Sequence, residues 1–424
     1  MMKKIKTKKL KNGITIVSVP TDSPSVTVMA LVNTGSYFEE KSVNGISHFL
    51  EHMCFKGTHK KSGKEIMRYL DGLGAETNAF TSNEYTGYYV KSITKHWKRT
   101  LAVVSDIFLN STFPEEEMQK EKGVIIGEIS MYEDMPMRHV HDLFSNLMYG
   151  DQPAGRTILG TRKNITNMER KKIVTYHSEH YVAEATTIIV AGKVEHADVV
   201  DHVTKNFKSI LSTEKSPKKK VVNVQSSLRM SIHHKKTDQT HIVLGHRSYG
   251  FHHKDAIILK VIASTLGGGM SSRLFEKLRE DMGVGYYVHA GNVANSDTGI
   301  LEISCGVDSK RVPEVLSAIS LELLCLTKEL VPTEELQRIQ EYIIGNTQMA
   351  LESTDERAYY YGKLHLLGLE VRTPKDIAKK IKSVTAQDIR RVARNIIKND
   401  RLNIAMIGPH TNKETQKFKK ALRH

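Results

Sequence analysis

The first third of the chain changes from strand-like to helix-like patterning. Apolar stretches typical of strands occur at Ile14–Val19 and Val26–Val32. The later predicted elements are helices at Ile46–Phe55 and Lys64–Asp71, a long strand pattern through Thr77–Val90, and helices at Trp97–Leu109 and Glu115–Tyr132. Because strands and helices are grouped rather than strictly alternating, we expect an α+β fold. Each sheet should be mixed and mainly antiparallel, with helices packed on one face.

The chain also repeats itself at long range. Phe113–Glu128 resembles Val331–Asn346, since both have a proline, then acidic residues, then Ile-Ile-Gly at equal spacing. The apolar strand Thr187–Gly192 resembles Asn403–Gly408, and both end in glycine. Two such matches at similar offsets predict two homologous domains of ordinary size.

The domain boundaries follow from a change in composition. Residues 212–227 contain the run Ser216-Pro-Lys-Lys-Lys220, which is typical of a linker. We therefore expect an N-terminal domain at residues 1–211 and a C-terminal domain at residues 228–424. Strand patterns at Arg229–His234 and Thr240–His246 open the second domain.

Composition narrows the class of protein. The 424 residues are 39% hydrophobic and 26% charged, which is typical of a soluble globular chain. No apolar run approaches the ~18 residues of a membrane helix, so we expect no membrane partner. The Lys-rich start, Met1 to Asn12, lacks the apolar stretch of a signal peptide. Three scattered cysteines, Cys54, Cys305 and Cys325, form no disulfide framework, and we expect a cytoplasmic location.

The net charge of +15 raises the alternative of nucleic-acid binding. The lysines are spread over the whole chain, and no zinc-finger spacing or basic-aromatic motif accompanies them. We therefore expect no nucleic-acid partner. A steep salt dependence of nucleic-acid binding would contradict this expectation.

The sharpest local feature is the pentapeptide His48-Phe-Leu-Glu-His52 on a predicted helix. Residues four apart leave the same helix face, so both imidazoles can bind one tetrahedral zinc ion. Glu51 lies on the same side and can accept a proton from water. The alternative is a surface helix that carries two histidines by chance.

Two carboxylates on the helix at Glu115–Tyr132 complete this candidate site. Glu128 lies in an apolar stretch, where a carboxylate is costly to bury unless it is paired or binds a metal. The repeat has Asn346 at this position and no counterpart of the histidine motif. Glu121 lies two turns earlier on the same face and is a candidate to orient a ligand histidine. Its alternative is a solvated charge in an acidic helix start.

With Glu128 at this spacing, the chain resembles the pitrilysin-type (inverzincin) zinc metallopeptidases, and within them the mitochondrial-processing-peptidase-like branch. The resemblance extends to Gly45–Thr58, Asn78–Ser82 and Tyr132–Asp134, and spans nearly the whole chain. It implies that His48, His52 and Glu128 bind zinc, one ion per chain. It also implies that Glu51 is the general base and that Glu121 is the family's additional acid near the site.

The resemblance also implies residues that contact substrate. Asn78 and Ala79 lie on the strand that offers its edge to the substrate backbone. In the second half, Leu266–Leu274 resembles a glycine-rich signature of the family. Arg279 and Tyr286 match an Arg/Tyr pair that holds the scissile carbonyl and its developing negative charge.

The expected activity is zinc-dependent endopeptidase cleavage of unfolded peptides or flexible segments, bound as an extended strand in a chamber between domains. The alternative is a non-catalytic structural or assembly subunit of the same family. Long-chain relatives build their chamber from four such domains, so we expect two chains to assemble. Because both half-sites are present in one chain, a homodimer is expected, and a heterodimer stays open.

Overall fold

The fold is taken from a computed structural model that describes residues 4–422. The predictions that reach positions 1–3, in the Lys-rich start, and positions 423–424 lie outside the described residues. The chain forms two compact units, and each unit combines segments from both halves of the sequence. The first comprises residues up to Ser130, Arg156–Lys219 and Met349–Val371, and the second comprises Met131–Gly155, Lys220–Gln348 and the residues from Arg372 onward. The domains predicted at residues 1–211 and 228–424 stay a prediction. They describe the two halves of the sequence, whereas each compact unit also contains a segment of the other half.

The first unit is built on a six-stranded sheet in the order β1-β2-β6-β3-β5-β4. Its strands are β1 (Lys6–Lys9), β2 (Thr15–Pro20), β3 (Ser25–Val32), β4 (Glu76–Thr81), β5 (Thr86–Ile93) and β6 (Thr186–Gly192). Only β2 and β6 run parallel, and the other neighbours are antiparallel. This arrangement places β4 at one edge of the sheet.

The second unit repeats the same strand order, and within residues 4–422 it has no counterpart of β1. Its sheet runs β7-β11-β8-β10-β9, and β7 and β11 are the parallel pair. The strands are β7 (Arg229–His234), β8 (Gln239–Ser248), β9 (Gly285–Ala294), β10 (Gly299–Asp308) and β11 (Asn403–Gly408). The predicted α+β class with two mixed, mainly antiparallel sheets is therefore confirmed.

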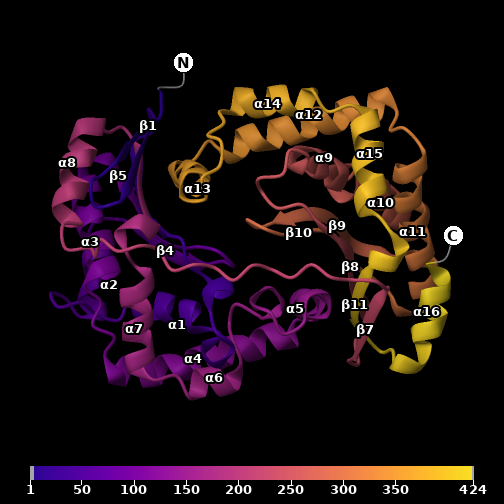
Figure 1. Cartoon of the computed structure of the whole chain (residues 1–424), viewed down its shortest axis with the longest axis horizontal. Helices are drawn as coiled ribbons and strands as arrows, with labels where there is room; N and C mark the ends of the chain where they lie inside the picture. The colour runs from indigo at the N-terminus through magenta and orange to yellow at the C-terminus, as the bar shows by residue number, and fades with distance from the viewer. Residues whose placement is uncertain (1–3, 423–424) are drawn as a thin grey trace. The chain divides into compact units, whose positions relative to one another are not determined.

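Helices surround both sheets (Figure 1). Those of the first unit are α1 (Ile46–Met53), α2 (Gly63–Asp71), α3 (Trp97–Leu109), α4 (Glu115–Asp134), α6 (Arg162–Thr166), α7 (Arg170–His180), α8 (His196–Asn206) and α13 (Thr354–Leu366). Those of the second are α5 (Pro136–Tyr149), α9 (Ala256–Gly267), α10 (Arg273–Phe275), α11 (Val312–Lys328), α12 (Thr333–Ala350), α14 (Pro374–Lys382), α15 (Ala386–Ile396) and α16 (Thr415–Ala421). The last residues of α4 and α12 extend past the unit boundaries. Among residues 4–422, no helix is long and apolar enough to cross a bilayer.

One predicted element is wrong. The long strand pattern through Thr77–Val90 is a hairpin of two strands, β4 and β5. Its turn is closed by a 2.9 Å hydrogen bond from the Ser82 amide to the Tyr85 carbonyl. Ser-Asn pairs are typical of turns, because their side chains bond to the local backbone. The strand-like residues on both sides concealed this turn in the sequence pattern.

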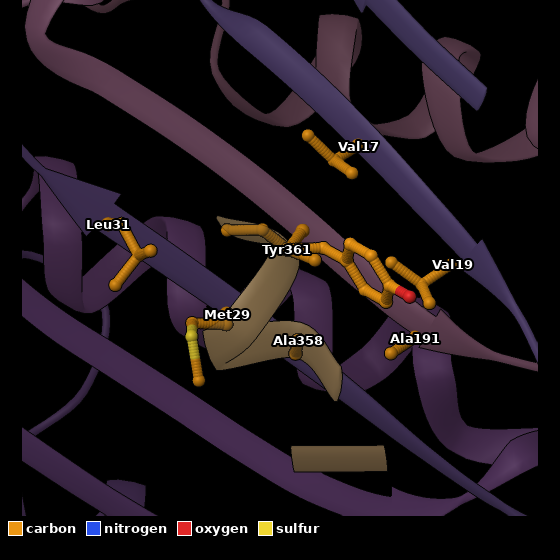
Figure 2. Packing of buried hydrophobic residues seen from close by; sticks show 8 residues of the cluster. Val17, Val19, Met29, Leu31, Ala191, Ala358 and Tyr361 are labelled. Atoms are coloured by element: carbon orange, nitrogen blue, oxygen red, sulfur yellow. The ribbon is translucent and has the colours of Figure 1, made fainter. Parts of the chain in front are cut away.

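Helix α13 comes from the second half of the sequence but packs on the first sheet (Figure 2). Tyr361 and Ala358 are buried against alternate residues of three strands: Val17, Val19, Met29, Leu31, Ile189 and Ala191. Ser18 alternates with these residues in β2, and its hydroxyl lies 2.9 Å from Nδ1 of His196 in α8. Since successive strand side chains point to opposite faces, α13 and α8 cover opposite faces of the sheet. The prediction of helices on one face is therefore wrong for the first sheet.

The second unit receives a helix from the first half in return. In Figure 1, the purple α5 lies beside β11 and β7. Arg247 of β8 donates to the carbonyl of Met148, and the Tyr149 hydroxyl lies 3.0 Å from that of Thr298. No local pattern predicts this exchange, because an amphipathic helix does not reveal which sheet will cover it.

The exchanged helix predicts a stability effect. Tyr361→Ala should lower the free energy of unfolding of the first unit by about 3 kcal/mol, because it removes a fully buried aromatic ring and leaves a cavity in its place. The measurement is calorimetric unfolding of the full chain. Tyr69→Ala, at a tyrosine that is 37% exposed in the same unit, is the matched control. Equal shifts for the two variants would contradict the prediction.

Candidate metal centre

The helix that carries the histidine motif begins at a buried carboxylate. Glu39 accepts hydrogen bonds from the backbone amides of Gly45 (2.8 Å) and Ser47 (2.9 Å) at the start of α1. Gly45 has a positive φ of 99°, and a Cβ there would lie 2.7 Å from the carbonyl oxygen of Leu159. A glycine is therefore required where α1 begins. The carboxylate satisfies helix amides that would otherwise lack partners.

Both histidines leave α1 on one face, as the four-residue spacing predicts. Nε2 of His48 lies 3.5 Å from Oε2 of Glu128, and Nε2 of His52 lies 3.8 Å from the same oxygen. One ligand atom from each residue lies within 4.8 Å of the others. Ligand atoms bound at about 2.0–2.1 Å to a tetrahedral zinc ion lie about 3.3 Å apart. The three side chains therefore fit a zinc ion after small rotations.

Glu128 reaches this cluster from α4, a helix distant in sequence from α1. The expected burial of the Glu128 carboxylate is incomplete, because the side chain is 25% exposed. Its neighbour Val124 is 52% exposed. The apolar stretch is therefore only partly a core segment. What distinguishes Glu128 is its distance to both imidazoles rather than its burial.

Glu51 lies beside the ligand cluster and is held by a residue that sequence analysis missed. The hydroxyl of Thr81 donates to Oε2 of Glu51 at 2.6 Å. Thr81 ends strand β4, so the candidate base is fixed by the edge strand of the sheet. The motif Asn78–Ser82 contained this threonine, but strand alternation alone does not say which helix residue it meets.

Glu121 is not a solvated charge. Its side chain is 7% exposed, and Oε2 lies 2.9 Å from Nδ1 of His52. Its other oxygen lies 2.5 Å from Nζ of Lys56, a residue that sequence analysis did not single out. A hydrogen bond to the outer ring nitrogen fixes the orientation of an imidazole. Glu121 therefore occupies the position that an orienting carboxylate requires.

The two histidines differ in their electrostatic surroundings. Burial, with a smaller effect of the neighbouring His52, lowers the pKa of His48 to about 3. For His52, burial acts in the same direction, but the hydrogen bond to Glu121 and nearby carboxylate charges outweigh it and raise the pKa. A neutral His48 at physiological pH is in the state that binds a metal.

The two carboxylates on either side of His52 also differ. Burial raises the pKa of Glu51, and this effect exceeds the opposite effects of Thr81 and His52. A raised pKa suits a group that must accept a proton and later donate it. Burial also raises the pKa of Glu121, but the hydrogen bonds from His52 and Lys56 outweigh it and leave the pKa lowered. Glu121 therefore stays ionised as an acceptor.

Asn78 and Ala79 lie on β4, which among the described strands pairs only with β5. Asn78 stands opposite Tyr89, and Ala79 stands opposite Tyr88. The backbone amide of Ala79 donates to the side-chain oxygen of Asn78 at 2.9 Å. This amide is therefore not used to pair with β5. An edge strand of this kind can accept an extended peptide as a further strand.

Arg279 and Tyr286 belong to the second unit and pair with each other. Nη1 of Arg279 donates to the backbone carbonyl of Tyr286 at 2.8 Å, and the Tyr286 side chain is largely exposed. Arg279 lies in a π-helical segment, Glu276–Asp281, which follows α10. Short π-helical segments are rare and often occur at functional sites. The sequence pattern did not predict this segment.

The equivalent position in the second unit lacks this chemistry. Asn346, the counterpart of Glu128 on α12, donates to the carbonyl of Tyr342 in its own helix at 2.8 Å. Among residues 4–422, one set of three or more histidine, cysteine, aspartate or glutamate side chains is arranged to hold a metal. It consists of His48, His52 and Glu128.

Comparison with known proteins assigns the chain to a family. Residues 15–162 match the model described as insulinase (peptidase family M16), and residues 167–343 match the M16 inactive domain. An uncharacterized zinc protease of Bacillus subtilis, YmxG, is 35% identical over 406 residues, which cover 95% of this chain and 97% of that protein. The chain belongs to peptidase family M16. An uncharacterized zinc protease of Streptomyces coelicolor is 32% identical over 97% of this chain and 91% of its own length.

Two solved structures share the fold of this chain. A protease from Helicobacter pylori superposes with a TM-score of 0.90 at 23% identity, covering 96% of this chain and all of that chain. A structure titled peptidase M16 inactive domain, from Pseudomonas fluorescens, gives 0.89 at 17% identity over 96% and 98%. The family models and the zinc-protease relatives confirm the predicted pitrilysin-type membership. The narrower processing-peptidase branch stays a prediction.

Proposed function

We propose that this M16 chain is a zinc-dependent endopeptidase that cleaves unfolded peptides or flexible segments. The observation that carries the proposal is the donor set of His48, His52 and Glu128, with Glu51 beside it. The relatives named zinc proteases support zinc as the metal. One such donor set in the described chain supports one ion per chain.

In the proposed mechanism, residues of the first unit hold the metal, transfer the proton and support these groups. His48, His52 and Glu128 would hold a zinc ion, which when bound would lower the pKa of a water molecule and polarise the substrate carbonyl. Glu51 accepts the proton of the attacking water and later donates it to the leaving amine. Thr81 holds one oxygen of Glu51 at 2.6 Å, so that the other can face the reacting water. Glu121 keeps the His52 ring in place.

The substrate is proposed to bind as an extended strand along β4. Ala79 and Thr81 point to the same face of the sheet, because side chains alternate along a strand. Since Thr81 contacts Glu51, a peptide paired with β4 would run past the candidate base. A segment whose backbone is already hydrogen-bonded in a folded protein cannot pair with β4, so the proposed substrates are unfolded peptides or flexible segments. Arg279 and Tyr286 are proposed to stabilise the negative charge that develops on the carbonyl oxygen.

The first test compares the chain with two variants. Glu51→Gln should retain zinc but lose at least about 100-fold in peptide hydrolysis, because it removes the proton acceptor and keeps the ligands. Glu128→Gln should lose zinc, because it removes a ligand. Metal content and cleavage of an unstructured peptide are measured on all three. A zinc-loaded wild-type chain without cleavage would favour the non-catalytic subunit instead.

A second test concerns the support of the base. Thr81→Val removes the hydroxyl and keeps the shape, so kcat should fall about tenfold or more with zinc content unchanged. Thr81→Ser keeps the donor and should stay close to wild type. The measurement is steady-state kinetics on the same peptide. If the two variants show equal kcat, the hydrogen bond has no catalytic role.

The third prediction concerns assembly. Two chains would bring together the four domains that the resemblance to longer relatives implies, so we expect a homodimer. Light scattering of the purified chain at micromolar concentration should give twice the mass of one 47.8 kDa chain. A dominant monomer would contradict this expectation, and a heterodimer would then require a second gene product.

A further inference from the structure

A lysine outside the histidine motif is connected to the metal centre through a buried carboxylate. Nζ of Lys56 lies 2.5 Å from one oxygen of Glu121, whose other oxygen lies 2.9 Å from Nδ1 of His52. The lysine side chain is 31% exposed, whereas that of Glu121 is 7% exposed. One carboxylate is therefore held from both sides, by a cation and by an imidazole.

The backbone around Lys56 is held in place by its neighbours. Its amide donates to the carbonyl of Met53 at 3.1 Å, directly after α1. A Cβ on Gly63, the first residue of α2, would lie 3.2 Å from Cα of Lys56 and 2.8 Å from the carbonyl oxygen of Phe55. This close approach joins the start of α2 to the turn that carries the lysine. The ammonium group is thus presented to α4 from a packed turn.

The two ligand histidines differ in their support. Nδ1 of His48 is buried and has no hydrogen-bond partner among the described residues. Nδ1 of His52 faces Glu121. A hydrogen bond through Nδ1 therefore orients the ring of His52 and not that of His48.

We propose that Lys56 is a positioning residue of the metal centre, which fixes Glu121 so that His52 directs Nε2 toward the metal. The proposal rests on the proposed zinc site. The alternative is an ordinary ion pair, which contributes little when partly exposed. The two hypotheses predict opposite changes in zinc affinity when Lys56 is replaced. A nearby cation repels a zinc ion, so removal of the lysine charge alone would tighten zinc binding. Loss of a positioning contact weakens zinc binding instead.

The experiment measures the zinc affinity of the full chain by competition with a chromophoric chelator. Lys56→Met removes the charge and the donor and should weaken zinc binding about tenfold. Lys56→Arg keeps both and should bind zinc nearly as the wild type does. The matched control is Lys60→Met, which removes the same charge four residues later, at a side chain that is 69% exposed and lies 3.6 Å from Asp106. It should leave the affinity unchanged.

A double-mutant cycle shows whether the effect passes through Glu121. In a Glu121→Gln background, Lys56→Met should cause no further loss, because the contact it supports is already gone. Equal affinities for Lys56→Met and Lys60→Met, tighter binding by Lys56→Met, or an undiminished loss in the Glu121→Gln background would each overturn the proposal. Thermal unfolding of the zinc-free variants checks that each is folded. A wild-type chain that binds no zinc would instead refute the proposed function.

Discussion

The contact between α1 and α4 is the constraint on which the metal centre depends. The two helices are far apart in the sequence, and α4 must present one face of carboxylates to the imidazoles of α1. Glu121 and Glu128 are seven residues apart, so both lie on this face. One meets the outer nitrogen of His52, and the other lies near the inner nitrogens of both histidines. In the proposed zinc site, the same helix thus supplies one ligand and the support of another ligand.

The two sheets share a strand order, but the candidate metal-binding residues are found in the first unit alone among the described residues. Both units have the same order of five strands and the same single parallel pair. The second unit has no histidine motif, and Asn346 turns back to its own helix. Without these ligands, the second unit offers other side chains. Its exposed Arg279 and Tyr286 are the proposed example.

The exchanged helices connect the halves of the chain through packing. The Tyr359 hydroxyl of α13 lies 2.5 Å from the Tyr85 hydroxyl, and its ring packs edge-on against Phe80 of β4. The hairpin that holds Thr81 is therefore supported by a helix from the second sequence half. The catalytic unit proposed here requires residues on both sides of the predicted linker. A fragment ending before the linker would expose the face that α13 covers.

Sequence patterns predicted those features of the protein that depend on residues close together along the chain. The helix period placed His48 and His52 on one face. The internal repeat showed Asn346 at the position equivalent to Glu128, and the alternation of apolar and polar residues predicted most strands within a few residues. The sequence did not reveal contacts between distant segments: Thr81 on Glu51, Lys56 on Glu121, or α13 on the first sheet. It also hid the hairpin turn at Ser82 and overstated the burial of Glu128. Periodicity tells which face of an element is apolar, but only tertiary packing decides which partner covers that face and which polar groups meet there.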